Sequence, residues 1–272
     1  MFFDARLSGN ALNTITMSRL IGPTTSLVTS STNAESGGAG SIGTAFENNI
    51  TFKPGIGFDW WCGFGRAFSF FDQVCYTGSG SAMTVAHNLG VVPELMVIKS
   101  RTTGGNREWV VYSKSIAIGQ YLYFTSAAAG SNTYWNGTAP TASVFSIDGS
   151  TLVNNSPPEK YVAYLFATCA GVSKVGSYSG NTGATVTVPC GFTGGVRWVM
   201  IKRTDSTGDW YIWDSARGIV AGNDPYLLLN TTAAQVTSTD YVDTISTGFE
   251  VTSTAPAALN ATGGPYIFLA IA

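Results

Sequence analysis

Short apolar runs separated by turn residues fill most of this chain. Runs such as ELMVIKS (94–100), RWVMIKR (197–203) and WVVY (109–112) are rich in Val, Ile and aromatic residues, and turn-forming residues bound each of them. Helical spacing is almost absent, and SAAAG and NTTAA offer at most one helical turn. Turn signals that recur about every 8–12 residues therefore predict an all-β protein with a sandwich or jelly-roll architecture.

The same pattern of apolar runs and turns occurs twice in the chain. YTGSGSAMTVAHNLGVVPELMVIKSR begins at Tyr76, and YSGNTGATVTVPCGFTGGVRWVMIKR begins at Tyr178. Further pairs follow in the same order: REWVVYSKS with GDWYIWDSARG, SVFSIDGS with TGFEVTST, and KYVAYLFATCA with PYIFLAIA. Because an ordered set of matches marks an internal repeat, we predict two tandem β-sandwiches, copy 1 over residues 71–171 and copy 2 over residues 172–272.

Residues 1–70 resemble the back half of a third copy. FFDARLSG near the start is similar to IWDSARG of copy 2, and NNITFKPGIGFDWWCGFGRA at Asn48 stands where the closing strands of a copy would lie. A half sandwich would expose apolar faces and sheet edges. We therefore expect this partial repeat to pack on the neighbouring copy, on another subunit, or on an upstream part of a longer protein.

Charge and composition narrow the range of partners. Charged residues make up 11% of the chain, and 14 basic against 16 acidic residues give a net charge of -2 without a block of either sign. Such a chain lacks the basic patch that nucleic acid or an anionic membrane would attract, so we expect neither partner. No apolar stretch approaches about 18 residues, and the N-terminus does not have the pattern of a secretory signal, which predicts no membrane insertion.

The sequence offers no established catalytic or metal motif. The four cysteines form no CxxC pair and are expected to be free thiols, and the single histidine, His87, precedes a turn without metal-ligand spacing. GAGSIG (38–43) matches a dinucleotide pattern but lacks the flanking strand and helix. We therefore predict no catalytic residues, no metal site and no cofactor.

Acidic residues leave one enzymatic alternative open. A glycan depolymerase would need a pair of carboxylates. The candidates in copy 2 are Asp205, Asp209, Asp214, Asp240 and Asp243, of which the depolymerase hypothesis uses Asp209, Asp214 or Asp240. The neighbouring Arg217, however, makes a loop-holding ion pair with Asp214 the preferred interpretation.

Aromatic residues suggest where a ligand would bind. Trp109 and Trp210 occupy equivalent positions among β-forming residues and are predicted to be core anchors. Candidates for contact with a glycan or host surface stand instead in predicted loops, Trp135 and Asn136 in copy 1 and Asp240 and Tyr241 in copy 2.

Several stretches carry a resemblance to a known family. FSFFDQVCYTGSG, HNLGVVPELMVIKSR, GDWYIWDS, NTTAAQVTSTDYV and YVAYLFA resemble the tandem β-rich repeat of virion appendage proteins of tailed bacteriophages, especially those of marine and cyanobacterial hosts. The resemblance spans both copies and, more faintly, residues 1–70. It implies a virion structural protein, a tail fibre or other appendage module that takes part in host attachment.

The resemblance also implies partners. Other virion proteins, other copies of the chain in a homo-oligomer, and a host surface glycan would be expected, and a trimer is carried over from fibres in general. A capsid decoration protein without a receptor and, less favoured, a glycan depolymerase remain as alternatives.

Overall fold

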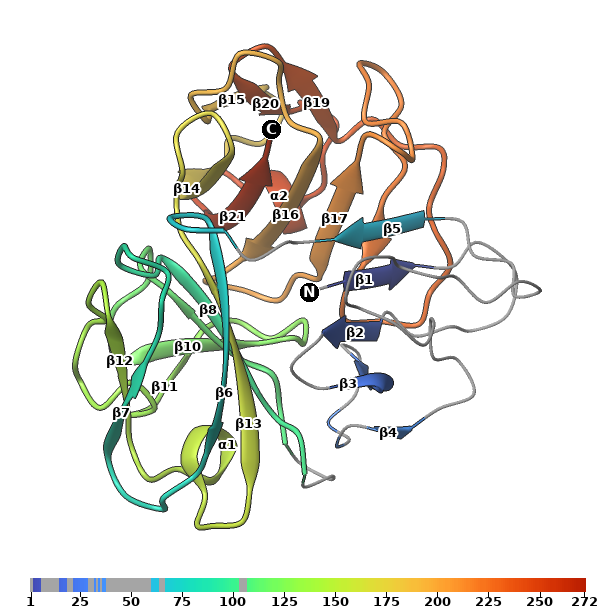
Figure 1. Cartoon of the computed structure of the whole chain (residues 1–272). Coiled ribbons are helices and arrows are strands. Elements are labelled where there is room, and N and C mark those ends of the chain that lie inside the picture. The colour runs from blue at the N-terminus through green and yellow to red at the C-terminus, as the bar shows by residue number, and fades with distance from the viewer. Residues whose placement is uncertain are drawn as a thin grey trace.

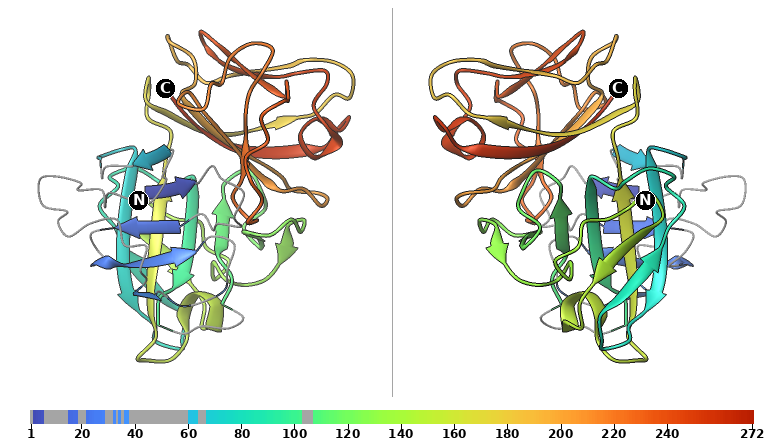
Figure 2. Two further views of the ribbon diagram at one scale, coloured as in Figure 1. Left: turned by 90° about the vertical axis from the view of Figure 1, so that its right-hand side faces the viewer. Right: turned by 90° about the vertical axis from the view of Figure 1, so that its left-hand side faces the viewer.

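The computed structural model describes residues 67–102 and 107–272, together with Thr32, Ala34 and the backbone of five N-terminal strands. These strands are β1 (Phe2–Ala5), β2 (Ile15–Ser18), β3 (Gly22–Val28), β4 (Ser36–Gly37) and β5 (Trp60–Gly63). They form one sheet in the order β4-β3-β2-β1-β5, which lies beside copy 1 (Figures 1 and 2). The GAGSIG segment and most of residues 1–70 lie outside the described residues, so the partial third repeat stays a prediction.

Copy 1 is a sandwich of a large and a small sheet. Its six-stranded sheet has the order β11-β10-β9-β8-β13-β6, and its small sheet pairs β12 with β7. The strands of the large sheet are β6 (Phe71–Thr77), β8 (Leu95–Ser100), β9 (Val110–Ser113), β10 (Gln120–Tyr123), β11 (Gly130–Ser131) and β13 (Lys160–Phe166). The small sheet consists of β7 (Met83–Ala86) and β12 (Val144–Ile147), and the single-turn helix α1 (Thr151–Asn154) follows it.

Copy 2 repeats this plan. Its five-stranded sheet has the order β14-β21-β16-β17-β18, and its small sheet the order β15-β20-β19. The large sheet contains β14 (Ser173–Ser179), β16 (Trp198–Arg203), β17 (Trp210–Asp214), β18 (Leu227–Leu228) and β21 (Pro265–Ile271). The small sheet contains β15 (Val186–Pro189), β19 (Val242–Ile245) and β20 (Gly248–Val251), and the short helix α2 (Ala257–Asn260) follows it. The predicted all-β fold with tandem sandwiches is confirmed.

Each large sheet is buried on both of its faces. In β8, Met96 and Ile98 point into the core of the copy 1 sandwich, while Leu95 and Val97 belong to a cluster shared with copy 2. Side chains alternate along a strand, so a strand covered on both sides reads as an unbroken apolar run. This explains why the sequence LMVIKS shows no polar alternation, since all six residues of β8 are buried.

Trp210 lies in the cluster that joins the two copies. Its indole Nε1 donates a hydrogen bond to the Tyr123 carbonyl oxygen at 2.8 Å, and its ring meets the Phe124 ring edge-on with centroids 5.0 Å apart. Phe124 in turn stacks on Trp109, with centroids 5.4 Å apart. Trp109 and Trp210 are each 1% exposed, which confirms their prediction as core anchors.

No helix in the described part of the chain is long and apolar enough to span a membrane.

Candidate functional site

Two stacked tyrosines secure the first and last strands of each copy. Tyr76 stacks on Tyr161 with ring centroids 5.2 Å apart, and Tyr178 stacks on Tyr266 at 4.8 Å. The first tyrosine of each pair donates its hydroxyl to a carbonyl of the short helix, Tyr76 to Val153 and Tyr178 to Leu259, both at 2.7 Å. Equivalent tyrosines therefore occupy equivalent surroundings, as the sequence repeat predicts.

A buried asparagine closes the same turn in both copies. The Asn154 amide donates to the carbonyl oxygens of Ser81 and Asp148, at 2.6 and 2.8 Å, and its Oδ1 accepts the Ser79 N–H at 2.7 Å. Asn260 repeats the arrangement with the Ala184 and Thr252 carbonyls and the Asn181 N–H, at 2.9, 3.0 and 2.7 Å. Both asparagines are fully buried, so these groups satisfy each other where water cannot.

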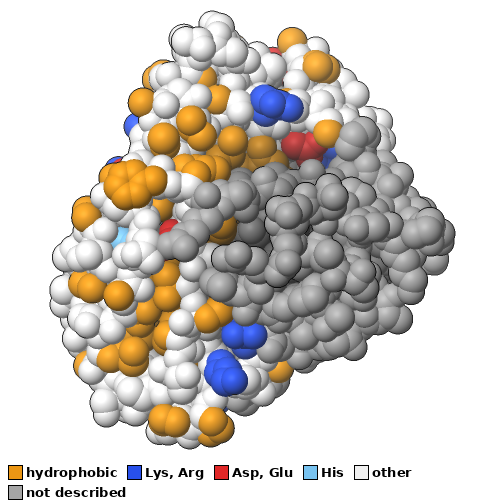
Figure 3. Space-filling model, in the orientation of Figure 1, with side chains coloured by type: hydrophobic (Ala, Val, Ile, Leu, Met, Phe, Trp, Pro, Cys, Tyr) orange, Lys and Arg blue, Asp and Glu red, His pale blue; other side chains and the backbone are white. Residues whose placement is uncertain are grey.

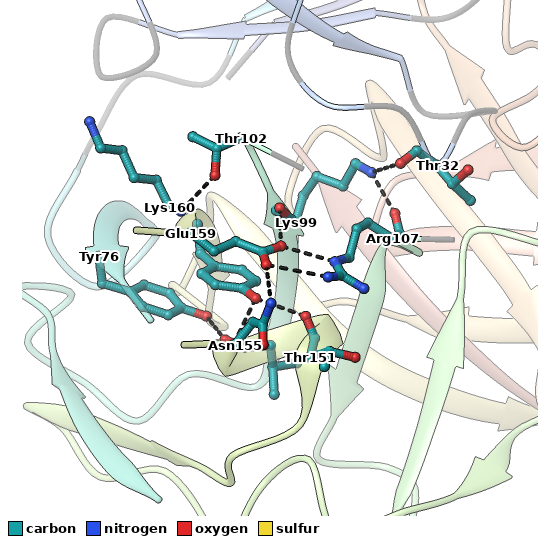
Figure 4. A network of polar contacts seen from close by, with 12 residues as sticks. Thr32, Tyr76, Lys99, Thr102, Arg107, Thr151, Asn155, Glu159 and Lys160 are labelled. Carbon is teal, nitrogen blue, oxygen red and sulfur yellow. Dashed lines mark hydrogen bonds and ion pairs between the residues drawn. The ribbon is translucent and has the colours of Figure 1, made fainter. Parts of the chain in front are cut away.

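A buried lysine ties each copy to the unit that precedes it. The Lys202 ammonium donates to the Ser126 carbonyl of copy 1 at 3.3 Å and to the Gly208 carbonyl of its own copy at 2.6 Å. Its counterpart Lys99 donates to the Thr32 carbonyl at 2.9 Å and to that of Arg107 (Figure 4). Burial lowers the pKa of both lysines to about 8. The Thr32 carbonyl thus accepts a hydrogen bond from a lysine of copy 1, just as the Ser126 carbonyl of copy 1 accepts one from a lysine of copy 2.

A charged network beside Lys99 has no counterpart in copy 2. Glu159 pairs with Arg107 at 3.0 Å and accepts hydrogen bonds from the Ser100 hydroxyl at 2.6 Å and the Asn155 amide at 2.7 Å (Figure 4). These bonds, against the effect of burial, lower the pKa of the Glu159 carboxyl. Every partner is an internal group, so the network holds loops together.

Of the two predicted ligand residues of copy 1, Trp135 lies in the core and Asn136 is exposed. Trp135 is 1% exposed, its Nε1 donates to the Gln120 carbonyl at 2.9 Å, and its ring packs edge-on against Tyr112. This corrects the expectation that the Trp135 ring is available for a sugar, because both of its faces lie within the sandwich. Asn136 is exposed with a φ of 48° and turns the chain directly after Trp135.

Of the two predicted residues of copy 2, Asp240 belongs to a carboxylate cluster and Tyr241 lies directly after it. One carboxylate oxygen from each of Asp224, Asp240 and Asp243 lies within 4.8 Å of the others, and the Tyr241 ring stacks on Tyr226 at 5.9 Å. Asp224 is fully buried and accepts the backbone N–H groups of Tyr241 at 2.9 Å and Val242 at 2.8 Å. Within the described residues this is the one group whose spacing would suit a hard cation such as Ca²⁺. Sequence analysis missed Asp224, which is brought to Asp240 only by the folded loops.

The stability of this cluster should depend on pH. Burial, with the neighbouring Asp240 and Asp243, raises the pKa of Asp224 to about 7, whereas an unfolded aspartate titrates near about 3.9. The folded state therefore holds more protons between these values, and the free energy of unfolding should fall as pH rises, by on the order of 2 kcal/mol between pH 5 and 7.5. Asp224→Asn should flatten this fall in urea titrations at pH 5 and 7.5 with a chelator present. An unchanged slope in the variant would contradict the assignment.

Other candidates from the sequence have structural partners. Nε2 of His87 lies 3.1 Å from the Thr141 carbonyl and Nδ1 accepts the Leu89 N–H at 3.3 Å, which confirms a turn-stabilising histidine. Asp214 pairs with Arg217 and accepts its backbone N–H at 2.8 Å, and Asp209 accepts the Asn230 amide at 2.8 Å. These carboxylates hold loops in place.

The cysteines also match their prediction where they are described. Cys75, Cys169 and Cys190 are free thiols, and burial raises the pKa of Cys190 to about 12. A thiol with so high a pKa is protonated and unreactive near neutral pH.

Comparison with known proteins places the chain in a family. No curated protein and no solved structure matches it. The family described as "Domain of unknown function (DUF7483)" matches residues 66–272, which contain both copies and more than half of the chain. The chain therefore belongs to the DUF7483 family.

Proposed function

We propose that this protein is a structural and adhesive module of a bacteriophage virion, a tail fibre or other appendage that takes part in attachment to the host surface. The sequence resemblance described above is the source of the viral assignment. The observation that supports a rigid appendage is the shared core around Trp210, which fixes the two sandwiches to each other. A rigid serial body of this kind can present loops at a distance from an attachment point.

The surface fits an exposed assembly component. On the face in Figure 3, charged side chains are few and scattered among polar and apolar ones. In each copy the side chain of a buried asparagine closes a turn, Asn154 in copy 1 and Asn260 in copy 2. A capsid decoration protein would share these properties, but it would lie on the head shell and not on the tail.

Location on the particle tests the proposal. Gold-labelled Fab fragments raised against the purified chain should label tails in electron micrographs of intact virions. The same Fab should lower host adsorption at least roughly tenfold, because bound antibody would block the adhesive surface. Labelling of the head shell without an effect on adsorption would favour decoration, and absence of the chain from purified particles would overturn the viral assignment.

The oligomeric state is a separate expectation. Light scattering on the native component should give a mass three times that of the 28.6 kDa chain if the trimer implied by fibres in general holds. A monomer at all concentrations would contradict the trimer and leave the location test unaffected.

A further inference from the structure

An open cleft lies at the junction of the two copies. It has a volume of about 360 Å³ and lies between β14 and β15, the edge strands of the two sheets of copy 2. Lys114 and Ser115, which follow β9 of copy 1, complete its lining. The volume is within the range of small-molecule sites, about 300–1,000 Å³, and suits one or two sugar rings.

The two copies differ at residues that line the cleft. Lys174 lines it, whereas the equivalent residue of copy 1 is Asp72, which is fully buried and accepts the Asn88 N–H at 2.7 Å. In copy 1 this residue therefore closes the edge of the sandwich. Positions that keep the fold, such as Tyr76 and Tyr178, are the same in both copies, so a reversal of charge at one position needs a reason other than folding.

A second difference changes the apolar floor of the cleft. Gly176 lines the cleft where copy 1 has Val74, and a Cβ atom at Gly176 would lie 2.7 Å from the Phe268 ring. The residue paired with Val74 across the sheet is Ala163, so the large and small residues have exchanged places. The Phe268 ring takes the space that a side chain at position 176 would need, and Phe268 and Val188 are part of the apolar floor of the cleft.

The charged groups around the cleft favour an anion. In the described part of the chain, Lys174 makes no side-chain ion pair or hydrogen bond, and Lys114 pairs with Glu94. Glu94 also accepts the Thr168 N–H at 2.9 Å, and Glu250 accepts the Thr187 hydroxyl at 2.8 Å, so both acids have internal partners. Lys174 is the cation left to meet an acidic group, with the Ser115 hydroxyl nearby on the lining.

We propose that this junction cleft binds an acidic sugar, a pyranose ring that carries a carboxylate or a sulfate. The acidic group pairs with Lys174, and the C–H face of the ring packs on the apolar floor. The inference deepens the proposed attachment function by naming the ligand class.

Titration of the purified full chain tests the inference. Ligand-observed NMR should detect saturable binding of D-glucuronate, of glucose 6-sulfate, or of both, and the responding probe identifies the acidic group. Glucose should bind roughly tenfold more weakly, because it lacks the charged group that pairs with Lys174, and a tenfold change corresponds to about 1.4 kcal/mol. Equal binding of glucose and the acidic probes, or no saturable binding of either acidic probe, would overturn the inference.

Variants locate the binding. Lys174→Met keeps the aliphatic stem and should weaken glucuronate or sulfate binding roughly tenfold, whereas Lys160→Met, at an exposed lysine of β13, should leave it unchanged. An unchanged melting temperature for Lys174→Met guards against unfolding as the cause of weaker binding. Wild-type affinity in Lys174→Met would overturn the site. A failure here with tail labelling intact would leave the proposed function standing.

Discussion

Trp210→Ala should lower the free energy of unfolding by about 3–5 kcal/mol, the range for removal of a buried tryptophan. The side chain is 1% exposed at the centre of the core shared by the two copies, and its loss would leave a cavity against Phe124. It would also leave the Tyr123 carbonyl without the indole N–H that now lies 2.8 Å away. Urea unfolding followed by circular dichroism measures the change.

The same variant should also change the cooperativity of unfolding. A shared core makes each copy depend on the other, so the wild-type copies should unfold in one transition. Trp210→Ala weakens that coupling and should separate the transition into two. Trp210→Phe, which keeps most of the apolar volume and loses the hydrogen bond to Tyr123, should cost roughly half as much or less. A loss below about 1 kcal/mol for the alanine variant would show that the copies do not rely on this contact.

The repeat and the fold class could be predicted because they rest on local signals. Turn residues and β-branched runs occur at matching positions in both copies, and equivalent residues such as Tyr76 and Tyr178 have equivalent neighbours. The contact between the copies could not be predicted in the same way. A strand with one exposed face shows polar residues at alternate positions, whereas a strand buried on both faces shows an unbroken apolar run. The apolar run of β8 therefore indicates burial on both faces, but it does not indicate which part of the protein covers the second face.

The residues of the candidate site were harder to predict than the fold, because their positions depend on tertiary structure. Trp135 stands among Asn, Thr and Gly in the sequence, which is typical of a loop, yet the chain folds its indole onto Gln120 and Tyr112. Asp224 and Asp240 are 16 residues apart in the sequence and meet because the chain between them folds back, so that the Asp224 N–H donates to the Thr239 carbonyl at 2.8 Å. In the sequence, alignment of the two copies sets Lys174 against Asp72, but the significance of this difference depends on the cleft beside Lys174.

Asn154→Ala and Asn260→Ala should each lower the free energy of unfolding by about 3 kcal/mol or more. Each change leaves one backbone N–H and two carbonyls of a tight turn without their partners, and an unsatisfied buried group costs about 1–3 kcal/mol. Asn181→Ala is the matched control, because the Asn181 side chain is exposed and only its backbone takes part in the turn. It should change stability by no more than about 0.5 kcal/mol.

The comparison between the two variants is more informative than either value. If the copies are equivalent bodies, the two losses should agree within about 1 kcal/mol, because each asparagine bonds two carbonyls and one N–H at nearly the same distances. A large loss in one copy with almost none in the other would mean that one turn is held by other contacts. Equal losses would show that the two copies keep the same turn at the same strength. The change from Asp72 in copy 1 to Lys174 in copy 2 would then be a local difference between otherwise equivalent sandwiches, as expected for a residue that binds a ligand.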